Sequence, residues 1–295
     1  MERMALEQLN AKSREDFARA LGEVFEHAPW VAERAYAARP FGSVTALYEA
    51  MTAAVRDADD AAQMTLIANH PDLAGKAARQ GAITEDSKRE QTSAGLDRLS
   101  DDEFAAFHRL NDAYRAKFAM PFVVCVRRHG KDSILGEFER RLNNDAASER
   151  QTALREIFRI VALRLDQRVA AADRLKVDGR LSTHVLDTLD GRPAAGVAVE
   201  LFELFRSGSS RLIARATTNE DGRTDRPLIA GQPVPIARYE LRFDIGAYFA
   251  RRAARLADPP FLGVVPVRFA VAEPEGYYHV PLIATPWSYT TYRGS

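Results

Sequence analysis

The sequence has little of several features that mark whole classes of protein. Its 295 residues include one cysteine, Cys125, which excludes an internal disulfide framework and favours a reducing compartment. No run approaches the roughly eighteen uninterrupted apolar residues of a membrane-spanning helix. Basic and acidic residues number 41 each, so no excess of positive charge indicates nucleic acid or an anionic membrane as a partner. The N-terminal stretch also lacks the apolar core of a secretory signal, so we expect a cytoplasmic protein.

What is present is a globular composition of 46% hydrophobic and 28% charged residues, at a length that suits two domains. The first half has helical periodicity. Ser13 is the expected N-cap of one helix, and Ser100 with Glu103 forms a capping box before another. Further helices are expected over 43–55, 132–144 and 148–175.

Near residue 178 the pattern changes to short β-rich runs separated by Gly, Pro and Asp turns. Alternation predicts strands over 197–204 and 238–245, with two more over 265–271 and 277–285 and a short helix over 246–254. The sequence therefore predicts a multidomain α and β protein: an all-α domain over 1–168, a linker over 169–179, and an all-β sandwich over 180–295.

Three polar residues in the β half are ambiguous when taken singly. His184 and His279 lie in predicted strands, where a histidine is usually a half-buried polar residue, and Arg223 follows an Asp-Gly turn, as a solvated arginine would. A zinc site lacks support, because no HExxH or paired short ligand spacing occurs and Cys125 lies elsewhere.

In combination the motifs of this half are more specific. LSTHVLDTLDGRPAAGV (181–197), TNEDGRTD (218–225) and YYHVPLIATPWSYTTYRGS (277–295) resemble the transthyretin-related 5-hydroxyisourate hydrolases. The resemblance covers nearly all of 178–295, and the terminal YRGS separates the hydrolases from hormone-carrying transthyretins. It implies a transthyretin-like sandwich that assembles as a tetramer, with two subunits completing each site. The implied site residues are His184, Arg223, His279 and Ser295, with Tyr292 and Arg293 nearby.

The chemistry of these residues suits hydrolysis of a cyclic amide. The reaction needs a positioned water, a base of near-neutral pKa and donors for the developing oxyanion. A neutral histidine can be the base, and Arg223 can hold the ring by forked hydrogen bonds. The residues leave open which histidine is the base, and we favour His184.

In the helical half, single residues again have structural interpretations. Cys125 lies in the apolar run FVVCV, as a buried residue does. Ser87 and Glu90 have the spacing of a capping box, so Glu90 alone is interpreted as a capping residue. Arg164 lies between two leucines in a long amphipathic helix, where a helix-surface arginine is the default.

Together, LNAKSREDFARALGEVFEHAPWVAERA (9–35), HPDLAGK (70–76), SKREQ (87–91), FVVCVRR (122–128) and FERRL (138–142) resemble the decarboxylases of 2-oxo-4-hydroxy-4-carboxy-5-ureidoimidazoline (OHCU). The resemblance covers about 5–170 and implies a dimer. It implies a catalytic His70, with Glu90 and Arg164 in the pocket. The implied substrate contacts are Pro71, Ser87, Gln91, Phe122, Val123, Val124 and Val126.

Decarboxylation leaves a carbanion-like centre that must be stabilised and protonated on one face. His70 can move the proton, Glu90 can fix the tautomer of His70 or hold the ureido group, and Arg164 can anchor a carboxylate. The substrate ring is its own electron sink, so we expect no cofactor and no metal.

The two resemblances describe consecutive reactions, so we expect a bifunctional enzyme of urate degradation that acts on small-molecule substrates. Two alternatives stay open: one domain alone is active, or the β half is a transthyretin-like binding module. The absorbance of freshly generated 5-hydroxyisourate distinguishes them, because a binder would not accelerate its disappearance. The chain also lacks a C-terminal peroxisomal signal of the Ser-Lys-Leu type.

Overall fold

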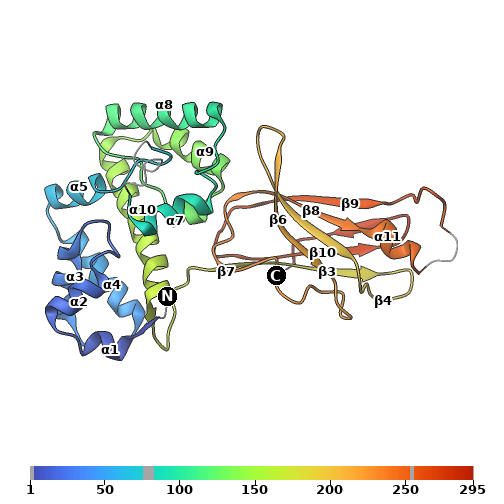
Figure 1. The fold of residues 1–295 in the computed structure, drawn as a ribbon, viewed down its shortest axis with the longest axis horizontal. Helices are drawn as coiled ribbons and strands as arrows, with labels where there is room; N and C mark the ends of the chain where they lie inside the picture. Colours follow the sequence, from blue (N-terminus) through green and yellow to red (C-terminus); the bar gives the residue numbers. More distant parts are fainter. Residues whose placement is uncertain (1–2, 76–82, 253–255, 295) are drawn as a thin grey trace. The chain divides into compact units, whose positions relative to one another are not determined.

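The computed structural model describes residues 3–75, 83–252 and 256–294 (Figure 1). The chain divides into two compact units, the first made of residues 1–127 and 133–177 and the second of residues 128–132 and 178–295. The first unit is helical and the second is built from sheets, so the predicted fold class is confirmed.

The described helical elements of the first unit are α1 (Leu6–Asn10), α2 (Arg14–Leu21), α3 (Pro29–Ala35), the 3₁₀ turn η1 (Tyr36–Ala38), α4 (Val44–Arg56), α5 (Asp60–Ala68), α7 (Glu85–Ser93), α8 (Asp101–Phe118), α9 (Lys131–Arg141) and α10 (Ala146–Arg168). A second 3₁₀ turn, η2 (Val126–Arg128), precedes α9. The long helix α10 contacts both α4 and α5. Its apolar residues, including Ile157, Val161 and Leu165, are fully buried in the core of this unit.

Side-chain caps explain where the helices begin. Ser13 and Ser100 each accept a hydrogen bond from the backbone N–H three residues on, and Ser100 with Glu103 forms the predicted capping box. The predicted box at Ser87 is wrong. The N-cap of α7 is Thr84, and Ser87 is the residue whose N–H donates to the Thr84 hydroxyl, at 3.3 Å. The Ser87 side chain is thereby left for another partner.

The end of α10 also differs from expectation. The helix stops at Arg168, and Val169–Ala170 form the short strand β2, which pairs in parallel with β1 (Met4–Ala5). Leu175 and Val177 are buried in the core of the first unit. Residues that we expected to act as a linker therefore pack with the helices up to Val177.

The second unit is a pair of sheets. Its described elements are β3 (Gly179–Asp187), β4 (Arg192–Pro193), β5 (Ala198–Leu204), β6 (Ser210–Thr217), β7 (Ile229–Gln232), β8 (Ala237–Asp244), α11 (Ile245–Ala250), β9 (Val264–Val271), β10 (Tyr277–Ala284) and β11 (Tyr289–Thr291). One sheet has the order β11-β10-β3-β4, with β7 also paired to β3, and the other has the order β6-β5-β8-β9.

The alternation of side chains fixes which face of each sheet is buried. Val199 and Leu201 on β5, and Leu241 and Phe243 on β8, are fully buried in the core of this unit. On β3 the odd-numbered residues are buried, so the even-numbered residues face outward. That outward face of β3 carries one of the predicted catalytic histidines.

Within the described residues, no helix is long and apolar enough to cross a membrane.

Candidate active sites

A small cavity in the helical unit has a volume of about 30 Å³. The residues that line it are His70, Pro71, Leu73, Ser87, Glu90, Gln91, Phe122, Val123, Val124, Val126, Ile160 and Arg164. This set includes every residue that the sequence analysis predicted for a decarboxylase site. The contributing segments are far apart in the sequence, and the packing of the helices brings them together.

His70 follows the C-terminal end of α5 and is buried. Its Nδ1 lies 3.0 Å from the carbonyl oxygen of Leu66. A carbonyl can only accept, so Nδ1 carries the hydrogen and the neutral ring has its lone pair on Nε2. Burial lowers the pKa of His70 to about 4, partly offset by the carboxylate of Glu26. His70 is therefore a neutral base whose tautomer is fixed by the backbone.

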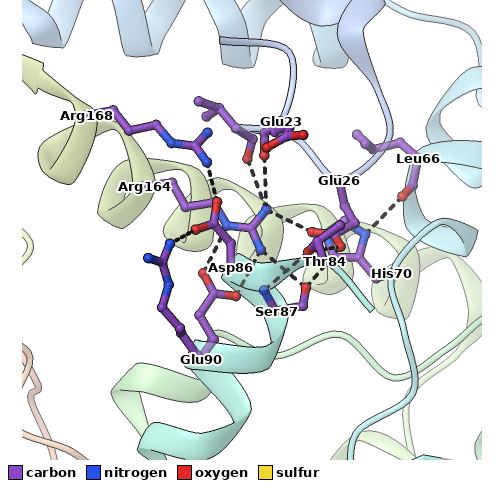
Figure 2. Close-up of polar contacts among 12 residues, drawn as sticks. Glu23, Glu26, Leu66, His70, Thr84, Asp86, Ser87, Glu90, Arg164 and Arg168 are labelled. Atoms are coloured by element: carbon purple, nitrogen blue, oxygen red, sulfur yellow. Dashed lines mark hydrogen bonds and ion pairs between the residues drawn. The ribbon is translucent and has the colours of Figure 1, made fainter. Parts of the chain in front are cut away.

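Arg164 and Glu90 form a forked ion pair at the cavity (Figure 2). The Nε and Nη2 of Arg164 donate to the two carboxylate oxygens of Glu90, at 2.9 and 3.0 Å. Burial raises the pKa of Glu90, although Arg164 opposes this effect. Arg164 itself is 3% exposed, so its interpretation as a helix-surface residue is wrong. Since both Glu90 oxygens accept from Arg164 and Nδ1 of His70 is bonded to Leu66, the expectation that Glu90 fixes the His70 tautomer is also wrong.

The segment before η2 lines the cavity and is anchored by two buried hydrogen bonds. The carbonyl of Val123 accepts from Nη1 of Arg141 at 2.8 Å, and the N–H of Cys125 donates to Glu156 at 2.9 Å. Cys125 is 1% exposed, which confirms its prediction as a buried residue.

The histidines of the β unit lie on the outward face of two neighbouring strands. The strands β3 and β10 pair in parallel, with His279 opposite Ser182 and Pro281 opposite His184. The two imidazole rings are 6.2 Å apart between centroids, and Nδ1 of His279 lies 3.0 Å from the Ser182 hydroxyl. His279 and Arg223 also line an open hollow with Arg180 and Ser182.

A tight turn brings Arg223 to the same face. Arg223 forms an antiparallel bridge with His184, and the preceding Gly222 has a φ of +72°. A Cβ on Gly222 would lie 2.3 Å from the carbonyl oxygen of Val185, so only glycine permits this approach. The Asp-Gly turn thus positions the arginine beside the histidine.

The C-terminal residues lie against β10. Gly294 is bridged to His279, and its N–H donates to the His279 carbonyl at 2.8 Å. The guanidinium of Arg293 is 4.7 Å from the ring centroid of Tyr278, and Tyr292 is exposed. Ser295, predicted as a site residue, lies outside the described residues.

Electrostatics keep both histidines of the β unit neutral near pH 7. Burial and then the positive charge of Arg223 lower the pKa of His184, with a smaller contribution from His279. Burial and Arg223 likewise lower the pKa of His279, with Arg180 contributing. In the part of the chain that the structure describes, no group of three or more His, Cys, Asp or Glu side chains is placed to hold a metal ion.

Several residues of these sites were missed in the sequence. Leu73 and Ile160 line the helical cavity as apolar residues, and Glu26 contacts Arg164 from behind it. Glu26 lies within the motif over 9–35, but a lone glutamate there carries no signal of its own. Ser182 is two residues before His184, and only the parallel register reveals that it contacts His279.

Comparisons with known proteins agree with this division. The OHCU decarboxylase family model matches residues 10–166, and the HIUase/Transthyretin family model matches residues 181–294. A 2-oxo-4-hydroxy-4-carboxy-5-ureidoimidazoline decarboxylase of Haloferax volcanii is 42% identical over 171 residues, which are 58% of this chain and 99% of that protein. A 5-hydroxyisourate hydrolase of Deinococcus radiodurans is 53% identical over 116 residues, which are 39% of this chain and 95% of that protein.

The chain belongs to both families. Its helical unit is an OHCU decarboxylase family domain, and its β unit is an HIUase/Transthyretin family domain. A crystal structure of (S)-allantoin synthase is 31% identical, with a TM-score of 0.50, and the match covers 99% of this chain and 100% of that one. A solved structure of similar length is therefore similar to this chain across both of its units.

Proposed function

We propose that this protein is a bifunctional enzyme of urate degradation. The β unit hydrolyses 5-hydroxyisourate to OHCU, and the helical unit decarboxylates OHCU to (S)-allantoin. One observation carries the proposal: a single chain contains residue sets for two consecutive reactions, one in the helical cavity and one on the outward face of β3 and β10. The whole-chain similarity to (S)-allantoin synthase supports the same function.

In the hydrolase step, water attacks a carbonyl of the cyclic amide, and a neutral histidine accepts the proton of that water. His184 is the base that we favour, because it lies next to Arg223 and its pKa stays below the ordinary value. Arg223 donates to the oxyanion that forms. The proton then passes to the leaving nitrogen as the C–N bond breaks and the ring opens.

In the decarboxylase step, the bond between the ring and the carboxylate breaks, and its electron pair passes into the ring as carbon dioxide leaves. One proton must then be added to a ring carbon. The neutral Nε2 of His70 takes the proton of the substrate hydroxyl as that oxygen becomes a carbonyl and returns it to the ring carbon on one face, while the ring nitrogen that received the electron pair takes one proton from solvent. The backbone of Val124 and the side chains of Ser87 and Gln91 hold the ring. We assign no cofactor, because the ring accepts the electron pair.

Single-site variants of the full chain test this assignment. We expect His70→Ala to accumulate OHCU and His184→Ala to accumulate 5-hydroxyisourate, as measured by absorbance and by the optical activity of the allantoin formed. His108→Ala is the matched control, since His108 meets the ring of Phe104 edge-on in α8 and belongs to neither site. Full activity of either site variant in both steps would refute its assignment. If unmutated protein does not accelerate the disappearance of 5-hydroxyisourate, the β unit is a binding module.

We also propose that the protein is a homo-oligomer in which two β units complete each hydrolase site. His184 and His279 lie on an open sheet face rather than in an enclosed cavity, and large side chains near that face are exposed, including Trp287 at 59% and Tyr289 at 45%. Such exposed apolar area indicates an interface. We expect the family tetramer through this unit and a dimer through the decarboxylase unit.

The variant Tyr289→Lys tests the interface, with Leu212→Lys as the matched control on the other sheet, where Leu212 is 38% exposed. Analytical ultracentrifugation should show dissociation only for Tyr289→Lys, with loss of hydrolase activity. An unchanged sedimentation coefficient with full hydrolase activity would refute the role of this face. A cytoplasmic location is part of the proposal, supported by the single buried cysteine.

A further inference from the structure

Glu26 is a buried carboxylate behind the decarboxylase cavity, and neither step of the proposed chemistry uses it. It is 1% exposed and lies in the segment between α2 and α3. One of its oxygens accepts from the hydroxyls of Thr84, at 2.6 Å, and Ser87, at 3.0 Å. The other oxygen accepts from Nη1 of Arg164 at 2.9 Å (Figure 2). Glu26 thus binds two cavity-lining side chains at once.

The hydrogen bonds of Arg164 show why this matters. Nε and one Nη2 hydrogen donate to Glu90, and the other Nη2 hydrogen is directed to the Ser87 hydroxyl at 3.5 Å. One Nη1 hydrogen donates to Glu26, and the other faces the carbonyls of Glu23 and Val24, each at 3.4 Å. Each of its five N–H groups therefore has a protein acceptor. In this arrangement Arg164 holds Glu90 and Ser87 in place and has no donor left over to anchor a substrate carboxylate.

Glu26 also sets the direction of the Ser87 hydrogen bond. An ionised carboxylate can only accept, so the hydroxyl hydrogen of Ser87 is committed to Glu26. Ser87 then offers the cavity a lone pair, which suits an N–H of the substrate. A neutral amide at position 26 could donate to Ser87 and turn its hydrogen elsewhere.

We infer that Glu26 is a positioning residue of the decarboxylase, which fixes Arg164 and Ser87 from behind the cavity so that Glu90 and His70 face the substrate in their working states. The inference rests on the proposed decarboxylase function and deepens it.

The charges around the cavity support a test by pH. Burial alone would raise the pKa of Glu26, but Arg164 and the Thr84 hydroxyl outweigh burial and hold it below its ordinary value, so Glu26 is ionised. Its negative charge raises the pKa of both His70 and Glu90. The other charged groups beside them are Arg164, which opposes this effect, and Asp86, which is itself paired with Arg168 and Arg89. Removing the charge of Glu26 should therefore lower the pKa of both cavity groups.

The experiment measures the pH dependence of OHCU decarboxylation by the full chain and its Glu26→Gln variant. The acid limb of the profile should move to lower pH in the variant, by about one pH unit for a charge at this range in a buried site. Glu149→Gln is the matched control. Glu149 is an equally buried carboxylate paired with an arginine, Arg141, in a separate cluster. Its loss should lower stability or rate without moving the acid limb.

A second variant guards against misfolding. Glu26→Asp keeps the charge but draws the carboxylate back by one methylene, so it cannot span Arg164 and the two hydroxyls. We expect kcat to fall at least about tenfold, by the sensitivity of catalysis to misplacement, with the acid limb of the profile unmoved. An unchanged kcat in Glu26→Asp, or a Glu26→Gln profile that loses amplitude without shifting, would overturn the inference. Inactive unmutated protein would instead refute the decarboxylase function, and the inference with it.

Discussion

Gly294 allows the C-terminal residues to lie against His279, which we propose as a residue of the hydrolase site, and its replacement by alanine should disable one activity alone. An ideal Cβ at this position would lie 2.9 Å from Cδ2 of His279, 3.2 Å from its Cβ and 3.4 Å from its Cγ. Unstrained carbon atoms approach to about 3.5–4.0 Å. Either the imidazole or the terminal residues must therefore move by about 0.5–1 Å.

That displacement is enough to damage the hydrolase site. The contact between Nδ1 of His279 and the Ser182 hydroxyl is 3.0 Å, and the Gly294 N–H donates to the His279 carbonyl at 2.8 Å. Lengthening either contact beyond about 3.5 Å ends the hydrogen bond. A misplacement of this size near reacting groups lowers catalysis by up to about 100-fold. We expect the catalytic efficiency of the hydrolase, expressed as kcat/KM, to fall by about 10- to 100-fold in Gly294→Ala.

The assay follows the absorbance of freshly generated 5-hydroxyisourate, and decarboxylation of OHCU is measured on the same preparation. Decarboxylation should be unchanged, because its cavity is made by the helical unit. Gly263→Ala is the matched control in the β unit, since a Cβ there meets no atom within 4 Å. If Gly294→Ala hydrolyses 5-hydroxyisourate as fast as Gly263→Ala, the close packing at His279 has no catalytic role.

The remaining predictions concern pH, the chain terminus and stability. Burial and Arg223 lower the pKa of His184, so the basic form of its ring should persist below pH 6.5. The acid limb of the pH profile of hydrolysis should therefore lie below that value. The variant Arg223→Gln removes a positive charge and should move this limb to higher pH. Deleting residues 292–295 should abolish hydrolysis and leave decarboxylation unchanged, whereas full activity in both steps would show that the terminus is dispensable. The variant Arg141→Leu leaves the fully buried Glu149 without its arginine. Urea titrations should show that the free energy of unfolding of the helical unit falls by about 3–5 kcal/mol. The double variant Arg141→Leu/Glu149→Leu should recover part of this loss.

The sequence predicted the elements well where one periodicity dominates. Alternation over 238–245 matches β8, whose Tyr239, Leu241 and Phe243 are buried, and the capping box at Ser100 is present. It failed where two local patterns overlapped. Thr84 and Ser87 can both begin a helix, and in the structure the helix begins at Thr84, while the hydroxyls of both residues donate to Glu26, which is distant in sequence.

Site residues were predictable to the extent that motifs, rather than periodicity, identify them. Arg164 has the local pattern of an exposed helix residue, yet it is buried because Glu26 and Glu90 compensate its charge from two other segments. Helical periodicity records only burial of apolar side chains, so it assigns a buried ion pair to the surface. Glu26 was missed for the same reason.

The two sites differ in what completes them. The decarboxylase cavity is built within the core of one helical unit: His70, Glu90 and Arg164 come from segments far apart in the sequence, and their donors and acceptors are matched within that unit. The hydrolase residues come from neighbouring strands, so the sheet alone aligns His184 with His279, but their outward face is open. Catalysis of hydrolysis needs several oxyanion donors and a site shielded from bulk water. An open face supplies little of either. The first site is therefore built by the packing of one unit, and the exposed face of the second supports our proposal of a subunit interface at the β unit's histidines.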